Sequence, residues 1–217
     1  MNKFCKDKIC YIIGAGQNYG VDLLANENRI VIAADGGMEY LSEQNIVPDF
    51  IIGDMDSIGY KPSGSNVIFL PEEKDDTDTV AALRFGIKKG CEVFVIFGGT
   101  GGRLDHTVAN LQALVFLAEQ GKRGYLVDKD NIVTALKNGT IRFDKTSDGV
   151  VSVFSASGRA EKVCIDGLKY ELKDATLNSS FPIGVSNCFI GKESVISVES
   201  GVLLIFYPKT VCIKNRT

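Results

Sequence analysis

Several segments in the first half of the chain carry apolar residues at consecutive positions rather than at alternating ones. In chain order the strand-like segments are CYIIGAG, RIVIAADGG, DFIIGDMDS, NVIFLPEE and EVFVIFGGT. A strand that is apolar on both faces is buried between two layers, as in a parallel sheet that helices cover. We therefore expect an α/β fold with an N-terminal, mostly parallel sheet and helices on both of its faces.

Two segments between and after these runs show helical spacing. The first follows DDTDT and places Val80, Leu83 and Ile87 on one face, with Asp76 or Thr77 available to cap its start. The second runs from about residue 105 to 120, with an apolar face formed by Leu104, Val108, Leu111, Val115 and Ala118. The alternation of strands and helices supports the α/β assignment.

The pattern changes after about residue 139. Short β-rich runs separated by turn residues follow one another: TIRF, GVVSVFSAS, KVCIDGLKYEL and SVISVESGVLLIFYP. This is typical of an antiparallel sheet or sandwich. We predict two domains, an α/β domain over residues 1–135 and a smaller all-β sandwich over residues 136–217.

The composition argues against several classes of partner. The net charge of −3 gives no basic surface for nucleic acid or anionic lipid. No apolar run approaches the roughly 18 residues of a membrane-spanning helix, and the first residues show no charged-then-apolar leader. The six cysteines form no C-x-x-C pair, and a single histidine disfavours a zinc site. We expect a cytoplasmic protein with reduced thiols.

Acidic residues stand where the expected strands end. Asp35 follows one apolar run, and Asp54 and Asp56 follow the next. A further group precedes the first predicted helix: Asp75, Asp76 and Asp78. Ligands of parallel sheets bind beyond the carboxyl ends of the strands, so we expect these carboxylates to converge at one edge. Because like charges repel at close range, the cluster predicts a counter-charge such as Mg²⁺, which prefers oxygen ligands.

Each acidic segment also has a purely structural interpretation. A D-x-D sequence in a loop is commonly a solvated turn, and acids before a helix cap it and interact favourably with its dipole. The recurrence of acids at the ends of successive strands favours the metal site over these alternatives.

The segment FGGTGGRLDH, residues 97–106, places four glycines in five positions after an expected strand. Bare backbone N–H groups there can bind phosphate oxygens, and the N-terminus of the next helix follows. Arg103 adds a planar fork suited to phosphate. The alternative is a flexible loop with a surface arginine. His106 is a candidate general base or a structural hydrogen-bonding residue.

The segment IIGAGQNYG looks like a dinucleotide-binding fingerprint, but its spacing is G-x-G-x-x-x-G rather than G-x-G-x-x-G. We interpret it as a tight strand-to-helix turn that lines the same edge, and NAD binding is disfavoured. The pattern G-x-x-x-x-G-K-[ST] is absent from the sequence, which argues against a P-loop kinase.

Together these segments resemble the thiamin pyrophosphokinase family. The matching pieces, in chain order, are ADGG, PDFIIGDMDS, KDDTD, GGTGGRLDH, GLKYEL and GVSN. The resemblance implies an α/β nucleotide-binding domain followed by a β-sandwich. It also implies a homodimer with the active site near the subunit interface, and Mg²⁺-dependent transfer of pyrophosphate from ATP to thiamin with release of AMP.

The resemblance further implies roles for individual residues. The catalytic and metal-binding carboxylates would be Asp54, Asp56 and Asp78, joined at the same edge by Asp35. The ATP-binding residues would be Gly98, Gly99, Gly101, Gly102, Arg103, Asp105 and His106. The residues beside thiamin would be Asp75, Thr77, Ser186 and Asn187. The chain has no tryptophan to stack on thiamin, and Phe189 is an aromatic candidate for that role.

Two other functions stay open from the sequence. A related pyrophosphokinase would use the same edge on another alcohol, such as a pterin, although the GVSN match favours thiamin. A non-catalytic nucleotide sensor would keep the glycine loop without needing the acids.

For a pyrophosphokinase, Asp35 and Asp78 are both candidates for accepting the proton of the attacking hydroxyl.

Overall fold

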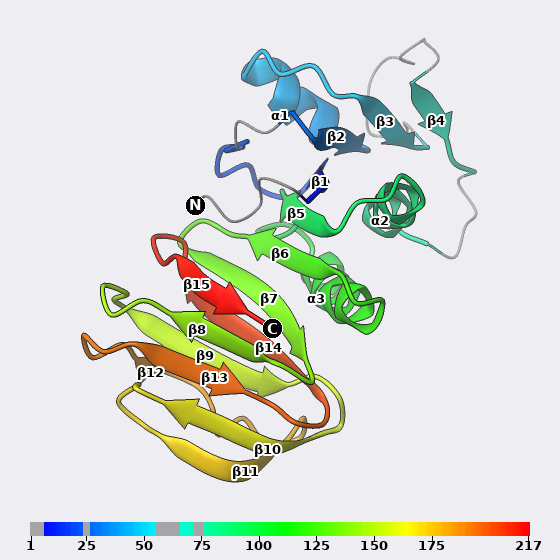
Figure 1. Cartoon of the computed structure of the whole chain (residues 1–217). Coiled ribbons are helices and arrows are strands. Elements are labelled where there is room, and N and C mark those ends of the chain that lie inside the picture. The colour runs from blue at the N-terminus through cyan, green and yellow to red at the C-terminus, as the bar shows by residue number, and fades with distance from the viewer. Residues whose placement is uncertain (1–6, 24–26, 55–65, 72–75) are drawn as a thin grey trace. The chain divides into compact units, whose positions relative to one another are not determined.

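The structure is a computed structural model that describes residues 7–23, 27–54, 66–71 and 76–217 (Figure 1). Asp56 and Asp75 therefore lie outside the described residues. The chain divides into two compact units. Unit 1 comprises Met1–Ala113 and Lys122–Asp128, and unit 2 comprises Leu114–Gly121 and Lys129–Thr217.

Unit 1 is built on a parallel sheet with the strand order β6-β5-β1-β2-β3-β4. The strands are β1 (Ile9–Ile13), β2 (Arg29–Ala34), β3 (Phe50–Gly53), β4 (Val67–Phe69), β5 (Val93–Phe97) and β6 (Arg123–Val127). Every residue of β1 is buried, as expected for a central strand that is covered on both faces. The parallel sheet predicted from the apolar runs is confirmed.

Helices connect these strands: α1 (Gly37–Glu43), α2 (Asp78–Lys88) and α3 (Leu104–Glu119). The β2–α1–β3 and β4–α2–β5 crossovers run across the sheet in opposite directions. Because such crossovers are right-handed, α1 and α2 cover opposite faces of the sheet, as Figure 1 shows. Gly86 lets α2 pack closely against the sheet, since a Cβ at this position would lie 2.7 Å from Cε1 of Phe94 in β5 and 2.8 Å from Sγ of Cys10 in β1.

The apolar face predicted for the second helix is partly wrong. Leu104 is 78% exposed and Val108 is 48% exposed. The buried positions of α3 instead include Asn110, Leu114 and Leu117. The helix itself is confirmed. Of the described helices, none combines the length and the apolar character needed to cross a bilayer.

Unit 2 consists of two antiparallel sheets, with the orders β12-β9-β14-β7 and β11-β10-β13-β8-β15. The first contains β7 (Asn131–Lys137), β9 (Val150–Ser155), β12 (Asn187–Cys188) and β14 (Val202–Pro208). The second contains β8 (Thr140–Phe143), β10 (Arg159–Asp166), β11 (Leu172–Asn178), β13 (Ser194–Ser197) and β15 (Ile213–Arg216). One apolar core, including Phe143 of β8 and Ile205 of β14, joins both sheets, which confirms the predicted all-β sandwich. The expected boundary between residues 135 and 136 falls within β7.

Candidate active site

The carboxyl ends of four neighbouring strands share one edge of the unit 1 sheet. Ile13 at the end of β1 pairs with Phe97 at the end of β5 and with Ala33 near the end of β2, and Ala34 pairs with Ile52 of β3. The acidic and glycine-rich segments that follow these strands therefore begin at the same edge.

Two glycine-rich segments run side by side beyond β1 and β5. The backbone N–H of Gly14 donates to the carbonyl of Phe97 at 2.8 Å, and that of Gly16 donates to the carbonyl of Gly98 at 2.7 Å. A Cβ at Gly16 would lie 2.5 Å from the Gly98 oxygen, so the close approach of the two backbones requires glycine. The GAGQNYG segment does line this edge, but within the described residues 14–23 it forms no helix, and the strand-to-helix interpretation is wrong there.

The carbonyl groups of residues 98–100 point into the protein. The Gly98 oxygen accepts from Gly16, and the Thr100 oxygen accepts from the N–H of Gln17 at 2.8 Å. The oxygen of Gly99 accepts from Nδ2 of Asn110 at 2.8 Å, and Asn110 is only 6% exposed.

The N–H groups of the same loop have a different environment. Within the part of the chain that the structure describes, no group accepts a hydrogen bond from the N–H of Gly99, Gly101 or Gly102. Gly98 and Gly101 have φ values of 61° and 76°. Successive backbone N–H groups in such a turn form a concave site for an anion, and the N-terminus of α3 follows directly. The loop has the chemistry of a phosphate-binding site.

Asp35 and Asp54 directly follow β2 and β3, which are two and three strands from β5 along the same edge of the sheet. The N–H of Asp35 donates to the carbonyl of Ile52 at 2.9 Å, and a Cβ at Gly53 would lie 3.2 Å from Cα of Asp35. Asp35 has a φ of 51°. This left-handed conformation costs an L-residue about 1–2 kcal/mol, although Asp tolerates it better than most. Such strained residues are common at functional sites.

The carboxylates at this edge fit Mg²⁺ by their donor chemistry. Mg²⁺ is usually held by one or two carboxylates together with waters and substrate phosphates, which Asp35, Asp54 and a bound phosphate chain would supply. Within the described residues, no three side chains of His, Cys, Asp or Glu form a metal site by themselves. The predicted ligand Asp56 lies outside those residues.

The segment before α2 caps this helix, as the sequence predicted. The hydroxyl of Thr77 accepts from the N–H of Val80 at 3.3 Å, so Thr77 is the N-cap residue. Asp76 forms an exposed ion pair with Nε of Arg84 at 2.9 Å. Asp78 is the first residue of α2 and is partly buried. The predicted contacts of Thr77 with thiamin and of Asp78 with a metal stay predictions.

Arg103 already has a carboxylate partner. Its Nε donates to Oδ1 of Asp105 at 3.2 Å and its Nη2 donates to Oδ2 at 2.6 Å. This bidentate pair raises the pKa of the Arg103 guanidinium and lowers the pKa of the Asp105 carboxyl. Oδ1 of Asp105 also accepts the N–H of His106 at 3.0 Å, in the first turn of α3. The pair is exposed and stands beside the glycine loop.

Sequence reasoning missed several residues that shape this edge. Oη of Tyr40 in α1 donates to the Gly16 carbonyl at 2.6 Å, and Oγ1 of Thr100 donates to Oδ1 of Asp128 at 2.5 Å. Asn110 was also missed. The sequence does contain an indication of its role. Asn110 stands four residues before Leu114, so both lie on the buried face of α3, and a buried polar side chain requires a hydrogen-bond partner.

In unit 2, the two residues expected to bind thiamin differ in environment. Ser186 is exposed and has a φ of 60°. Asn187 is 5% exposed; its Oδ1 accepts from the N–H of Tyr170 at 2.9 Å and its Nδ2 donates to the carbonyl of Tyr170 at 2.6 Å. The side-chain amide of Asn187 therefore holds the GLKYEL segment in place. Phe189 is buried against Phe143, with ring centroids 5.3 Å apart, and is unsuited to stack on a substrate.

We expect Asn187→Ala to lower the free energy of unfolding by about 1–3 kcal/mol, because it removes two partly buried hydrogen bonds to the Tyr170 backbone. Urea denaturation monitored by tyrosine fluorescence measures this change. Ser186→Ala is the matched neighbour and should leave stability unchanged. Equal stability of the two variants would contradict the structural role of Asn187.

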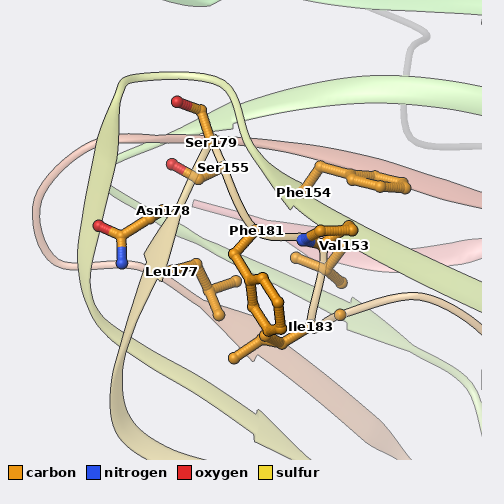
Figure 2. Close-up of a pocket in the computed structure, with 10 residues that line it drawn as sticks. Val153, Phe154, Ser155, Leu177, Asn178, Ser179, Phe181 and Ile183 are labelled. Atoms are coloured by element: carbon orange, nitrogen blue, oxygen red, sulfur yellow. The ribbon is translucent and has the colours of Figure 1, made fainter.

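A small hollow in unit 2 lies between Ser155, Leu177 and Phe181 (Figure 2). It encloses about 20 Å³, room for roughly one water molecule, and is too small for a substrate. Ser155 is 8% exposed, and within the described residues its Oγ has no hydrogen-bond partner.

Because this hydroxyl is buried without a partner, Ser155→Ala should leave the free energy of unfolding unchanged or raise it by up to about 1 kcal/mol. Ser194 is the matched control, since its buried Oγ donates to the carbonyl of Gly167 at 2.9 Å. Ser194→Ala should be destabilising by about 1 kcal/mol. Thermal unfolding of both variants measures the difference in stability between them. A destabilised Ser155→Ala would show that the Ser155 hydroxyl makes a stabilising hydrogen bond.

Comparisons with known proteins match both units. The family models "Thiamin pyrophosphokinase, catalytic domain" and "Thiamin pyrophosphokinase, vitamin B1 binding domain" match residues 21–126 and 138–203. Thiamine pyrophosphokinase of Bacillus subtilis (strain 168) is 27% identical over 203 residues, covering 89% of this chain and 95% of the relative. Thiamin pyrophosphokinase 1 of Caenorhabditis elegans is 27% identical over 200 residues, covering 84% of this chain and 80% of the relative. The crystal structure of the Bacillus subtilis enzyme superposes with a TM-score of 0.83 at 25% identity, covering 94% of this chain and 100% of that one.

Proposed function

Because the chain belongs to the thiamin pyrophosphokinase family of enzymes, we propose that it transfers the pyrophosphoryl group of ATP to the hydroxyl oxygen of thiamin. The observation that carries this proposal is the Gly98–Gly102 loop. The carbonyls of residues 98–100 accept hydrogen bonds from the protein, while the N–H groups of Gly99, Gly101 and Gly102 have no acceptor within the described residues. The carboxylates of Asp35 and Asp54 follow β2 and β3 at the same edge of the sheet.

The reaction requires an in-line displacement at phosphorus. The hydroxyl oxygen of thiamin bonds to the β-phosphorus of ATP, and the bond from that phosphorus to the oxygen bridging the α- and β-phosphates breaks. AMP leaves with the bridging oxygen, and the hydroxyl proton passes to a carboxylate. Asp35 and Asp78 are the two candidates for this acceptor. Such transfers depend mainly on positioning and on stabilisation of charge.

The residues at this edge of the unit 1 sheet would have separate roles in the reaction. The N–H groups of the loop would bind the phosphate oxygens of ATP. Asp105 engages Nε and Nη2 of Arg103, which leaves Nη1 for a phosphate oxygen. Asp35 and Asp54, with Asp56 and Asp78 as the resemblance implies, would hold Mg²⁺. Bound there, the ion would neutralise the charge of the phosphates and polarise the β-phosphorus.

The remaining parts of the proposal rest on the family resemblance alone. Ser186 of unit 2 would contact thiamin. The enzyme would work as a homodimer with its active site near the subunit interface. A location in the reducing cytoplasm rests instead on the scattered cysteines of the sequence.

Incubation of the protein with ATP, Mg²⁺ and either thiamin or a pterin alcohol, followed by chromatography of the nucleotides, tests the function. We expect AMP and thiamin diphosphate in equal amounts with thiamin only. Formation of ADP would indicate an ordinary kinase, and AMP formed only with the pterin would indicate a related pyrophosphokinase. ATP binding without turnover would indicate a nucleotide sensor.

A further inference from the structure

The glycine loop is tied to the strand beside it through one side chain. Oγ1 of Thr100 donates to Oδ1 of Asp128 at 2.5 Å. Asp128 directly follows β6, and β6 pairs in parallel with β5, which leads into the loop. The bond is partly buried, and an O–H donor on a carboxylate at this distance is a strong, charge-assisted hydrogen bond.

Thr100 is the one residue of the Gly98–Gly102 loop whose side chain can be fastened, because the other four are glycines. A glycine-rich segment loses more conformational freedom on ordering than any other, so a binding loop of this composition requires anchors. The Thr100 hydroxyl is anchored at Asp128 and the neighbouring Gly99 carbonyl is anchored at Asn110.

The two anchors fix the direction of the backbone. With the Gly99 carbonyl held by α3 and Thr100 held by the end of β6, the peptide units on either side turn their oxygens inward. The opposite ends of these units, the N–H groups, are then preorganised for an anion before it binds. Preorganised donors stabilise charge more than mobile ones, because binding does not have to order them.

We propose that Asp128 and Asn110 are positioning residues for the nucleotide: they hold the Gly98–Gly102 loop in the conformation that binds the phosphate chain. Asp128 acts by accepting the hydrogen bond of Thr100 and not by a direct electrostatic effect on the nucleotide. The inference rests on the proposed function in identifying the anion as the phosphate chain of ATP.

A set of variants on the Thr100–Asp128 bond tests this role in the full-length protein. Asp128→Ala and Thr100→Val should each raise the KM for ATP about ten-fold, the usual effect of losing a hydrogen bond to a charged group. The KM for thiamin should not change. The double variant should be no worse than either single variant, because both remove the same bond. Asp128→Asn keeps an oxygen acceptor and should stay within about three-fold of the wild type.

Two further variants complete the design. Asn110→Leu removes the second anchor and should also raise the KM for ATP by about ten-fold. Asp130→Ala is the control, because Asp130 is an exposed carboxylate two residues beyond Asp128 and should leave all constants unchanged. Circular dichroism and thermal unfolding identify any variant that fails to fold, and Thr100→Val then carries the test in place of Asp128→Ala.

The outcomes separate this inference from the function itself. Calorimetric titration with ATP alone, without Mg²⁺ or thiamin, measures nucleotide binding even if the wild type does not turn over thiamin. Weaker ATP binding in Asp128→Ala and Thr100→Val, with near-normal binding in Asp128→Asn, supports the inference whatever the reaction. Equal losses in Asp128→Asn and Asp128→Ala, additive losses in the double variant, unchanged ATP affinity, or a wild type that binds no ATP would overturn it.

Discussion

The Asp35→Asn variant should have a kcat about 10²–10³-fold below that of the wild type, comparable to the loss of one electrostatic stabiliser of a transition state. The substitution removes a negative charge from the edge that we propose to bind the phosphates and their counter-ion. It leaves the backbone undisturbed, because Asn accepts the φ of 51° at this position at least as readily as Asp. Steady-state kinetics at saturating ATP, thiamin and Mg²⁺ measure the effect.

The matched control is Glu119→Gln, which also removes one negative charge. Glu119 is exposed and lies at the opposite end of α3 from the glycine loop, so its loss should leave kcat unchanged. Both variants should unfold at the temperature of the wild type. Near-native turnover in Asp35→Asn would remove this carboxylate from the mechanism, whereas a parallel fall in thermal stability would indicate a structural role.

Gly98→Ala should be destabilising by about 3 kcal/mol and should abolish measurable ATP binding. Two effects add at this position. The φ of 61° is a left-handed conformation that alanine disfavours, and the new Cβ would lie 2.3 Å from the carbonyl oxygen of Gly14. Because the obstructing atom belongs to the backbone, relief requires the two glycine segments to separate. That separation would break the bond between Gly16 and Gly98 and disorder the loop. Urea denaturation and calorimetric ATP titration measure the two losses.

Gly121→Ala isolates the conformational part of this effect. Gly121 has a φ of 69°, and a Cβ there would meet no atom within 4 Å. This variant should lose only about 1–2 kcal/mol of stability and should keep its affinity for ATP. If Gly98→Ala loses no more than Gly121→Ala and still binds ATP, the close packing of the two segments does not support the phosphate site.

The sequence predicted the strands of unit 1 because their apolar runs are local and continuous. The convergence of their ends followed from parallel pairing, and Ile13, Ala34 and Phe97 do stand at one edge. The direct pairing of Gly16 with Gly98 could not be predicted, since it joins segments about 80 residues apart that carry no complementary side chains.

The residues that hold the site were harder to predict than those expected to bind substrate. Asp128 and Thr100 are 28 positions apart. Thr100 lies inside the glycine-rich motif, but Asp128 belongs to no motif that the sequence shows. Asn187 shows that one residue can match a family motif and also support the fold. The GVSN motif predicts a contact with thiamin, which stays a prediction, and the structure adds that both ends of the amide bond the backbone of Tyr170. Short motifs locate a site, but hydrogen-bond partners distinguish the residues that bind from those that support.

A crystal structure with Mg²⁺, thiamin and α,β-methylene-ATP, whose α–β linkage cannot be cleaved, tests the central claim most directly. The expected result places the phosphate oxygens on the N–H groups of Gly99–Gly102, with a cation between those oxygens and the carboxylates of Asp35 and Asp54. The thiamin hydroxyl should face the β-phosphorus. A nucleotide bound elsewhere, or phosphates on the loop with no cation at the two carboxylates, would contradict the account.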